Sequence, residues 1–293
     1  MIDSIRSAMR ASILEMVGGG SGPPVAFLTP KGDPGLFGPN SMVWRVHGDF
    51  VSMMIGGIGS LALQALHPMA LAGVWDHSTF RQDLKGRLGR TAYFIAATTY
   101  GPKEMALEII DKVNNIHQHV NGIDELGRPY SAADPNLLKW VHITETYSFL
   151  KAFQKYCSPR LTALEEDQYF KEMKVLGEMM GAIGLPASLV DTEREILSYF
   201  NELKYGERAK TIIDLLTNFP SPIHTKPITL LISRAGFANL PNWALNFINK
   251  EAPSPMEKLF LTTSVNLMAI PIREALKNGV AAHSYKRVYG LDS

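Results

Sequence analysis

The chain has 293 residues, of which 46% are hydrophobic and 19% are charged, so it can bury a sizeable core like an ordinary globular protein. Its 29 lysines and arginines nearly balance 28 aspartates and glutamates, and no basic stripe interleaved with aromatic residues points to a nucleic-acid partner. The single cysteine, Cys157, excludes an internal disulfide framework and multi-cysteine zinc or iron–sulfur sites, and it favours a reducing, cytoplasmic compartment.

Residues 2–17 carry apolar side chains at helical spacing, and a glycine- and proline-rich run over 18–24 ends the pattern. The sequence therefore predicts an N-terminal helical arm and Gly-rich hinge over residues 1–24, followed by a single domain over 25–293. The arm mixes charged with apolar residues and has neither an apolar signal core nor a twin-arginine start, so we expect no export.

The rest of the chain predicts helices separated by glycine and proline. After an irregular loop over 25–39, the expected helices cover 40–66, 69–76, 80–99, 103–121, 134–156, 162–181, 189–203, 206–218, 225–237, 240–249 and 256–276. We find no convincing alternating strand and no repeat. The predicted fold is all-α, a single large helical domain with about ten or more helices.

The most apolar stretch, residues 51–75, nearly reaches membrane-spanning length. Four glycines and the polar run over 64–68 interrupt it. A buried helix followed by a turn explains this stretch better, so we expect no transmembrane segment.

The helix expected over 103–121 carries an apolar stripe that contains a histidine, His117. His119 lies roughly 200° away around the helix, so the two histidines cannot bind one metal from a regular helix. A histidine on a buried face satisfies its ring nitrogens with a carbonyl, a side chain or a metal, and the stripe alone does not choose among them.

The preceding helix places Arg87, Arg90, Thr91, Phe94 and Thr98 on one face, so two guanidiniums continue a stripe with an aromatic ring. Buried arginines need anions, such as haem propionates or a carboxylate substrate, because an unpaired buried charge costs several kcal/mol. The alternative is a partly solvated helix start whose arginine stems pack on the core.

A series of short motifs over about 115 residues resembles the catalytic domain of the family that includes rubber oxygenase and the fungal oxygenase of mycophenolic acid synthesis. In chain order the motifs are Trp44, His67-Pro68, Asp76-His77-Ser78, Arg87-x-x-Arg90-Thr91, Tyr100-Gly101, Val113-x-x-Ile116-His117-x-x-Val120-x-Gly122, Tyr130, Asp134-Pro135 and Trp140-Val141-His142.

This resemblance implies an all-helical fold that encloses haem b, with His117 as the proximal iron ligand and Arg87, Arg90 and Thr91 on the oxygen side. Two positions depart from rubber oxygenase: Arg90 stands where that enzyme has a lysine, and Asn121 where it has an arginine. Because arginine does not lose its proton, Arg90 cannot act as a base but can stabilise negative charge. Asn121 implies a different pairing of the haem propionates, and both departures make polyisoprene an unexpected substrate.

Three other residues are candidates for the site. His77 precedes Ser78 at an expected helix start and could donate a hydrogen bond on the oxygen side or cap the helix. His142 is a rival haem-binding residue, although its surroundings are less apolar than those of His117. Cys157 lacks the glycine-rich loop and arginine that accompany a haem-binding thiolate in cytochromes P450.

The sequence thus predicts a haem-b-dependent oxygenase that acts on a small apolar organic substrate with dioxygen or peroxide. The alternatives left open are a haem-binding sensor or carrier without turnover, and a helical protein in which His117 and the arginines satisfy one another without a cofactor. Assembly into a homo-oligomer is left open as well.

Overall fold

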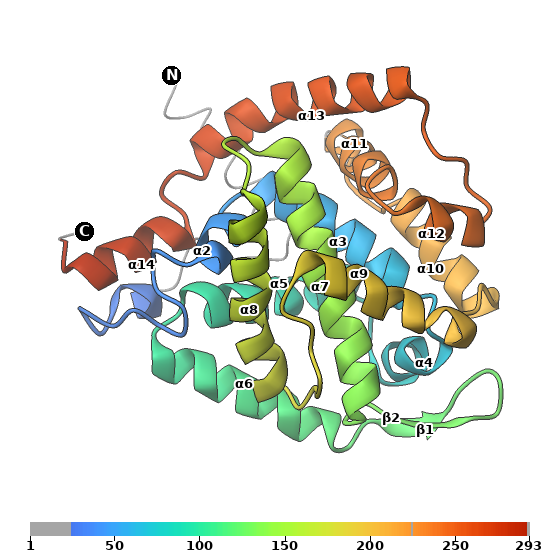
Figure 1. Cartoon of the computed structure of the whole chain (residues 1–293). Helices are drawn as coiled ribbons and strands as arrows, with labels where there is room; N and C mark the ends of the chain where they lie inside the picture. Colours follow the sequence, from blue (N-terminus) through green and yellow to red (C-terminus); the bar gives the residue numbers. More distant parts are fainter. Residues whose placement is uncertain (1–24, 224, 292–293) are drawn as a thin grey trace.

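The structure, a computed structural model, describes residues 25–223 and 225–291, so the predicted arm over 1–24 lies outside the described residues (Figure 1). Within them the chain forms thirteen α-helices, two short 3₁₀ helices and one small sheet, which confirms the all-α prediction. The elements are η1 (Val25–Leu28), α2 (Met42–His47), α3 (Phe50–Gln64), α4 (Pro68–His77), α5 (Leu84–Tyr100), α6 (Lys103–His117), β1 (Asn121–Ile123), β2 (Pro129–Ser131), α7 (Pro135–Tyr156), α8 (Ala163–Met179), α9 (Leu189–Ser198), η2 (Phe200–Glu202), α10 (Glu207–Thr217), α11 (Lys226–Phe237), α12 (Asn242–Phe247), α13 (Pro255–Ala275) and α14 (Val280–Tyr289).

Helices α3 and α7 form the centre of the molecule, and the other helices surround them (Figure 1). Glycines let the two backbones approach closely, since a Cβ atom added at Gly56 would lie 2.7 Å from Cδ1 and 2.9 Å from Cα of Phe149. Further along, the side chain of Gln64 donates a hydrogen bond to the carbonyl of Val141 at 3.2 Å. These two contacts show that α3 and α7 are antiparallel.

No single helix of the described part is long and apolar enough to cross a membrane. Helices α3 and α4 would pass such a test only as a pair, and they are bent by 108° relative to each other. This agrees with the prediction of a buried helix followed by a turn.

The sequence-based boundaries were wrong in three places. The helix expected over 40–66 is interrupted after α2, because Asp49 caps the start of α3 by accepting a hydrogen bond from the backbone N–H of Ser52 at 2.8 Å. Residues 121–131 form an antiparallel hairpin, in which Asn121 pairs with Ser131 and Ile123 with Pro129. Helix α14 was not expected at all.

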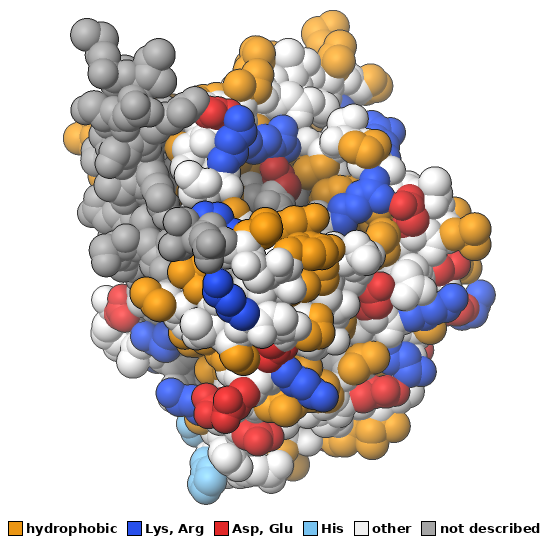
Figure 2. Space-filling view, turned by 90° about the vertical axis from the view of Figure 1, so that its left-hand side faces the viewer, with side chains coloured by type: hydrophobic (Ala, Val, Ile, Leu, Met, Phe, Trp, Pro, Cys, Tyr) orange, Lys and Arg blue, Asp and Glu red, His pale blue; other side chains and the backbone are white. Residues whose placement is uncertain are grey.

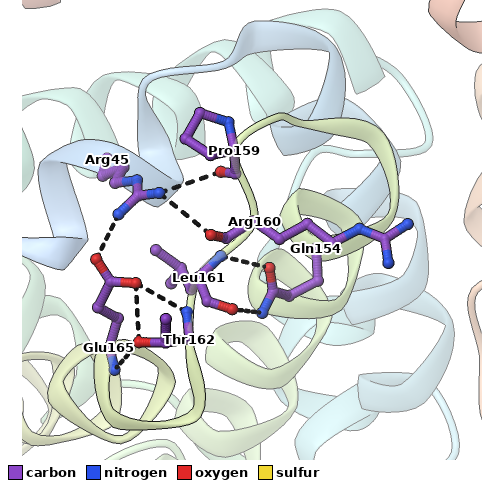
Figure 3. A network of polar contacts seen from close by, with 7 residues as sticks. All are labelled: Arg45, Gln154, Pro159, Arg160, Leu161, Thr162 and Glu165. Carbon is purple, nitrogen blue, oxygen red and sulfur yellow. Dashed lines mark hydrogen bonds and ion pairs between the residues drawn. The ribbon is translucent and has the colours of Figure 1, made fainter.

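Half-buried and exposed polar contacts hold the segment between α7 and α8 and the start of α8 (Figure 3). Thr162 and Glu165 form a capping box at the start of α8. Arg45 of α2 donates to Glu165 at 2.7 Å and to the carbonyl of Pro159 at 3.1 Å, while the amide of Gln154 holds the backbone of Leu161. The network joins α2, α7 and α8, three helices that lie next to the site described below.

The outer surface carries charges of both signs. On the face shown in Figure 2, acidic and basic side chains are interspersed among apolar ones, and neither sign forms a continuous stripe there. This face therefore gives no support for binding a polyanion such as nucleic acid.

Candidate functional site

One stripe of α3 remains accessible inside an otherwise buried helix. The residues of α3 that keep accessible surface recur at intervals of three and four, and they are Phe50, Met53, Met54, Gly57, Leu61 and Gln64. A Cβ atom added at Gly57 would meet no atom within 4 Å. Gly57 therefore borders open space, whereas Phe50, Met53, Met54 and Leu61 pack in part against the core.

The facing side of α7 carries a carboxyl group, that of Glu145. Protein surrounds this carboxyl, and burial raises its pKa to about 7, although the positive charge of Arg87 opposes the shift. The residue nevertheless keeps part of its accessible surface. Because Glu145 lies one turn after Val141, which contacts Gln64, it is level with the α3 stripe.

Arg87 of α5 is a half-buried charged residue that interacts electrostatically with Glu145. Its guanidinium donates a hydrogen bond to the hydroxyl of Thr91, one turn later on the same helix. Burial lowers the pKa of Arg87, the nearby charge of Arg90 lowers it further, and Glu145 raises it. No ion pair within 4.0 Å joins Arg87 to Glu145, so the two opposite charges act on each other without touching.

His117 ends α6 and is half-buried. Its Nδ1 atom is buried and has no hydrogen-bond partner among the described residues. Burial lowers the pKa of His117, and the charge of Arg87 lowers it further, so the imidazole is neutral near pH 7. The apolar stripe around it is less continuous than predicted, since Ile116 is 52% exposed.

The other histidines near this region all have protein partners. His119 is exposed and donates from Nδ1 to the carbonyl of Asn115 at 2.8 Å, which confirms that it faces away from His117. His142 faces α8, donates a hydrogen bond to the carbonyl of Met173, and has a pKa lowered by burial to about 4. Of these three rings, only that of His117 has a buried nitrogen left without a partner.

Arg90 lies further out than predicted. Its side chain is 59% exposed, donates to the hydroxyl of Thr79 at 3.2 Å and lies 3.6 Å from Asp83. The expectation of two buried guanidiniums is therefore right only in part: Arg87 faces the interior, and Arg90 faces solvent. Residues three positions apart lie about 60° apart around a helix, so Arg87 can face the interior while Arg90, on the same stripe, faces solvent.

His77 and Asn121 meet each other at the hairpin. His77 is the last residue of α4 rather than the start of a helix, and its Nε2 atom donates to the carbonyl of Asn121 at 3.1 Å. Both residues are exposed. His67 immediately precedes α4 and caps it by accepting from the backbone N–H of Ala70 at 3.5 Å.

Sequence reasoning singled out the arginine and the histidine but missed Glu145. A signal was present: a carboxylate in the middle of a long core helix, with Val141 and Phe149 four residues before and after it and no lysine or arginine one turn away. A charged residue in that setting lacks the local partner that a solvated face usually supplies.

The donor set of the described part does not build a metal site from protein alone. Residues 25–223 and 225–291 hold no group of three or more His, Cys, Asp or Glu side chains that could bind a metal ion. A macrocyclic iron cofactor would need a single ligand from the protein, and His117 fits that need because its buried Nδ1 atom has no partner among the described residues.

The described part of the chain is thus an all-helical domain in which a half-buried arginine, Arg87, and a half-buried histidine, His117, lie close enough to act on each other electrostatically. The chain belongs to the family described as ER-bound oxygenase mpaB/B′ and rubber oxygenase, catalytic domain, whose model matches residues 44–286. No curated protein and no solved structure matches the chain. The match extends well beyond the motifs of residues 44–142 and includes α8 to α13 and most of α14.

Proposed function

We propose that the protein is a haem-b-dependent oxygenase in which His117 binds the iron. The observation that supports this proposal is the buried Nδ1 atom of His117, which has no hydrogen-bond partner among the described residues. The positive charge of Arg87 adds to the effect of burial and lowers the pKa of this ring further. A buried polar atom without a hydrogen bond costs about 1–3 kcal/mol, and iron bound by this nitrogen would remove that cost. Membership in an oxygenase family supports the same function.

Bound haem would supply an iron at which dioxygen or peroxide is activated. The protein residues contribute charge and position. Arg87, held by Thr91, presents a permanent positive charge to the interior and stabilises negative charge that develops there or on a propionate. Arg90 adds a second, outer positive charge and cannot serve as a base.

His77 and Asn121 form a pair that we assign to the edge of the site. Their hydrogen bond ties the end of α4 to β1, only a few residues after His117 along the chain. The ring of His142 on α7 already donates a hydrogen bond to the carbonyl of Met173 on α8. We therefore propose that His142 packs between these two helices and does not bind iron.

The proposed substrate is a small organic molecule with a large apolar part. The α3 stripe supports this, because Met53, Gly57 and Leu61 offer an apolar wall with room beside it. We further propose that residues 25–293 act as one catalytic domain with 1–24 as an arm, and that the protein works in the cytoplasm, where its lone Cys157 stays reduced.

The test is the absorption spectrum of protein expressed with adequate iron, with and without reductant and carbon monoxide. We expect a Soret band in the wild type, its loss in His117→Ala and its retention in His119→Ala, a matched control two residues away whose ring bonds to Asn115. A colourless, folded wild type would refute the haem proposal. A Soret band that survives in His117→Ala would show that another residue binds the iron.

A further inference from the structure

Helix α13 has two apolar faces, and the described residues cover only one of them. Its inner face packs against α3, α7 and α11, and the residues buried there are Leu261, Val265, Ala269 and Ile272. The outer face lies on the opposite side of the helix, at the edge of the molecule (Figure 1). Its large apolar side chains are each 63–80% exposed, and they are Met256, Leu259, Phe260, Leu267 and Ile270. A continuous exposed apolar surface of this kind marks an interaction site.

The arm over residues 1–24, which lies outside the described residues, carries an apolar stripe of the same spacing. The sequence predicts a helix over 2–17 with its apolar side chains at Ile2, Ile5, Met9, Ile13 and Met16. Adding 254 to each of these numbers gives five exposed residues of α13, namely Met256, Leu259, Thr263, Leu267 and Ile270. Both stripes extend over about 21 Å of helix, and four of the five α13 positions are apolar.

The arm joins the described fold close to the end of α13. It leads into η1, which is fixed to α14, because Arg287 donates to the carbonyl of Phe27 at 3.0 Å and accepts from the N–H of Gly32 at 2.8 Å. Phe27 belongs to an apolar cluster against which Val280, the first residue of α14, packs. Only residues 276–279 separate Val280 from the end of α13.

We propose that residues 2–17 form a helix that packs along the outer face of α13. The Gly- and Pro-rich residues 18–24 can reach up to about 25 Å when extended, so the end of this helix can lie beside the end of α13. Both helices then run toward the same end of the molecule. They are parallel, with Ile2 beside Met256 and Met16 beside Ile270.

The short connection favours the arm of the same chain over other occupants of this face. A flexible connection of this length holds the two surfaces at an effective concentration in the millimolar range, which free copies of the protein do not reach at ordinary concentrations. The arm thereby removes from water an apolar surface that would otherwise associate with other molecules. This role is independent of the cofactor.

The first test is the rate at which trypsin cleaves the full-length protein after Arg6, followed by mass spectrometry, with each variant at the same haem content. A docked helix resists cleavage, because a protease needs locally unfolded chain. Leu267→Asp on α13 and Ile13→Asp on the arm should each raise the rate by about tenfold or more. Leu164→Asp is the matched control and should behave like the wild type, because this leucine of α8 is 83% exposed on another helix.

The second test is disulfide formation in full-length protein that carries Cys157→Ser and two new cysteines. The pair Met9→Cys and Thr263→Cys should form a disulfide within one chain, because residues that face each other between packed helices lie close enough for this bond. The control pair is Ser7→Cys with Thr263→Cys. Residue 7 lies about 160° from residue 9 around the helix, so this pair should react at least about tenfold more slowly.

Equal cleavage rates in the wild type and Leu267→Asp, or equal reaction of the two cysteine pairs, would overturn the proposal. A disulfide that joins two chains would assign the outer face to a second copy instead. Protection from trypsin that occurs only with phosphatidylcholine vesicles would assign it to a membrane surface. If Leu267→Asp does not fold, Ile13→Asp gives the same comparison from a position outside the packed core.

Discussion

Two neighbouring glycines of α3 test which side of this helix borders open space and which side packs against α7. Replacing glycine by alanine inside a helix stabilises a protein by about 0.5–1 kcal/mol when the added methyl group meets no obstacle. At Gly57 no atom lies within 4 Å of the added Cβ, so Gly57→Ala should gain this full amount. At Gly56 the added Cβ would lie 2.7 Å from Cδ1 and 2.9 Å from Cα of Phe149, and the Cα belongs to the backbone of the central partner helix.

Overpacking of this kind costs about 1–3 kcal/mol, which exceeds the helical gain, so Gly56→Ala should lose roughly 1 kcal/mol or more. The two variants should therefore differ by about 2 kcal/mol, or roughly 4–8 °C in Tm. Thermal and urea unfolding of the full-length protein, each variant at the same haem content, measures the difference. If both variants shift Tm in the same direction by similar amounts, Gly57 does not border open space.

Two further predictions concern the hairpin and the outer arginine. The buried Asp124 accepts hydrogen bonds from the backbone N–H groups of Leu126 and Arg128 at 2.9 and 2.8 Å and from Nε of Arg128 at 2.8 Å. Burial alone would raise the pKa of Asp124, but these hydrogen bonds outweigh burial and lower the pKa below its ordinary value. The stabilisation is present at neutral pH and lost as pH falls through the lowered pKa, so Asp124→Asn should cost roughly 1–3 kcal/mol near pH 7 in urea unfolding and progressively less as the pH is lowered into the acid range; a cost that does not change with pH would contradict this. Arg90→Leu should leave haem content intact and shift Tm by less than about 2 °C, because the side chain is 59% exposed, yet lower turnover by roughly tenfold or more; unchanged turnover would remove Arg90 from the reaction.

The sequence predicted long helices well wherever their ends carry strong local signals. Asp134 followed by Pro135 predicts the start of α7, and in the structure Asp134 caps that helix by accepting from the N–H of Asn136 at 2.7 Å. The start of α6 after a glycine and a proline was likewise right. These signals act within a few residues, so a single sequence contains them.

The hairpin over 121–131 could not be predicted in the same way. Its strands have three residues each, too few for an alternating pattern, and Asp124 forms its turn with partners only two to four residues away. The interruption of the 40–66 helix depends in part on the bond between Asp49 and Arg273, which joins residues 224 positions apart in the sequence.

Part of the candidate site follows from local pattern, and part requires the fold. Periodicity places Arg87 and Thr91 on one face, and they are hydrogen-bonded in the structure. The exposure of Arg90 and the enclosure of Glu145 depend on which helix packs over each residue. The residues one turn from Glu145 show that it lacks a local charged partner but not which helix packs over it, and Arg87 and Glu145 are 58 positions apart.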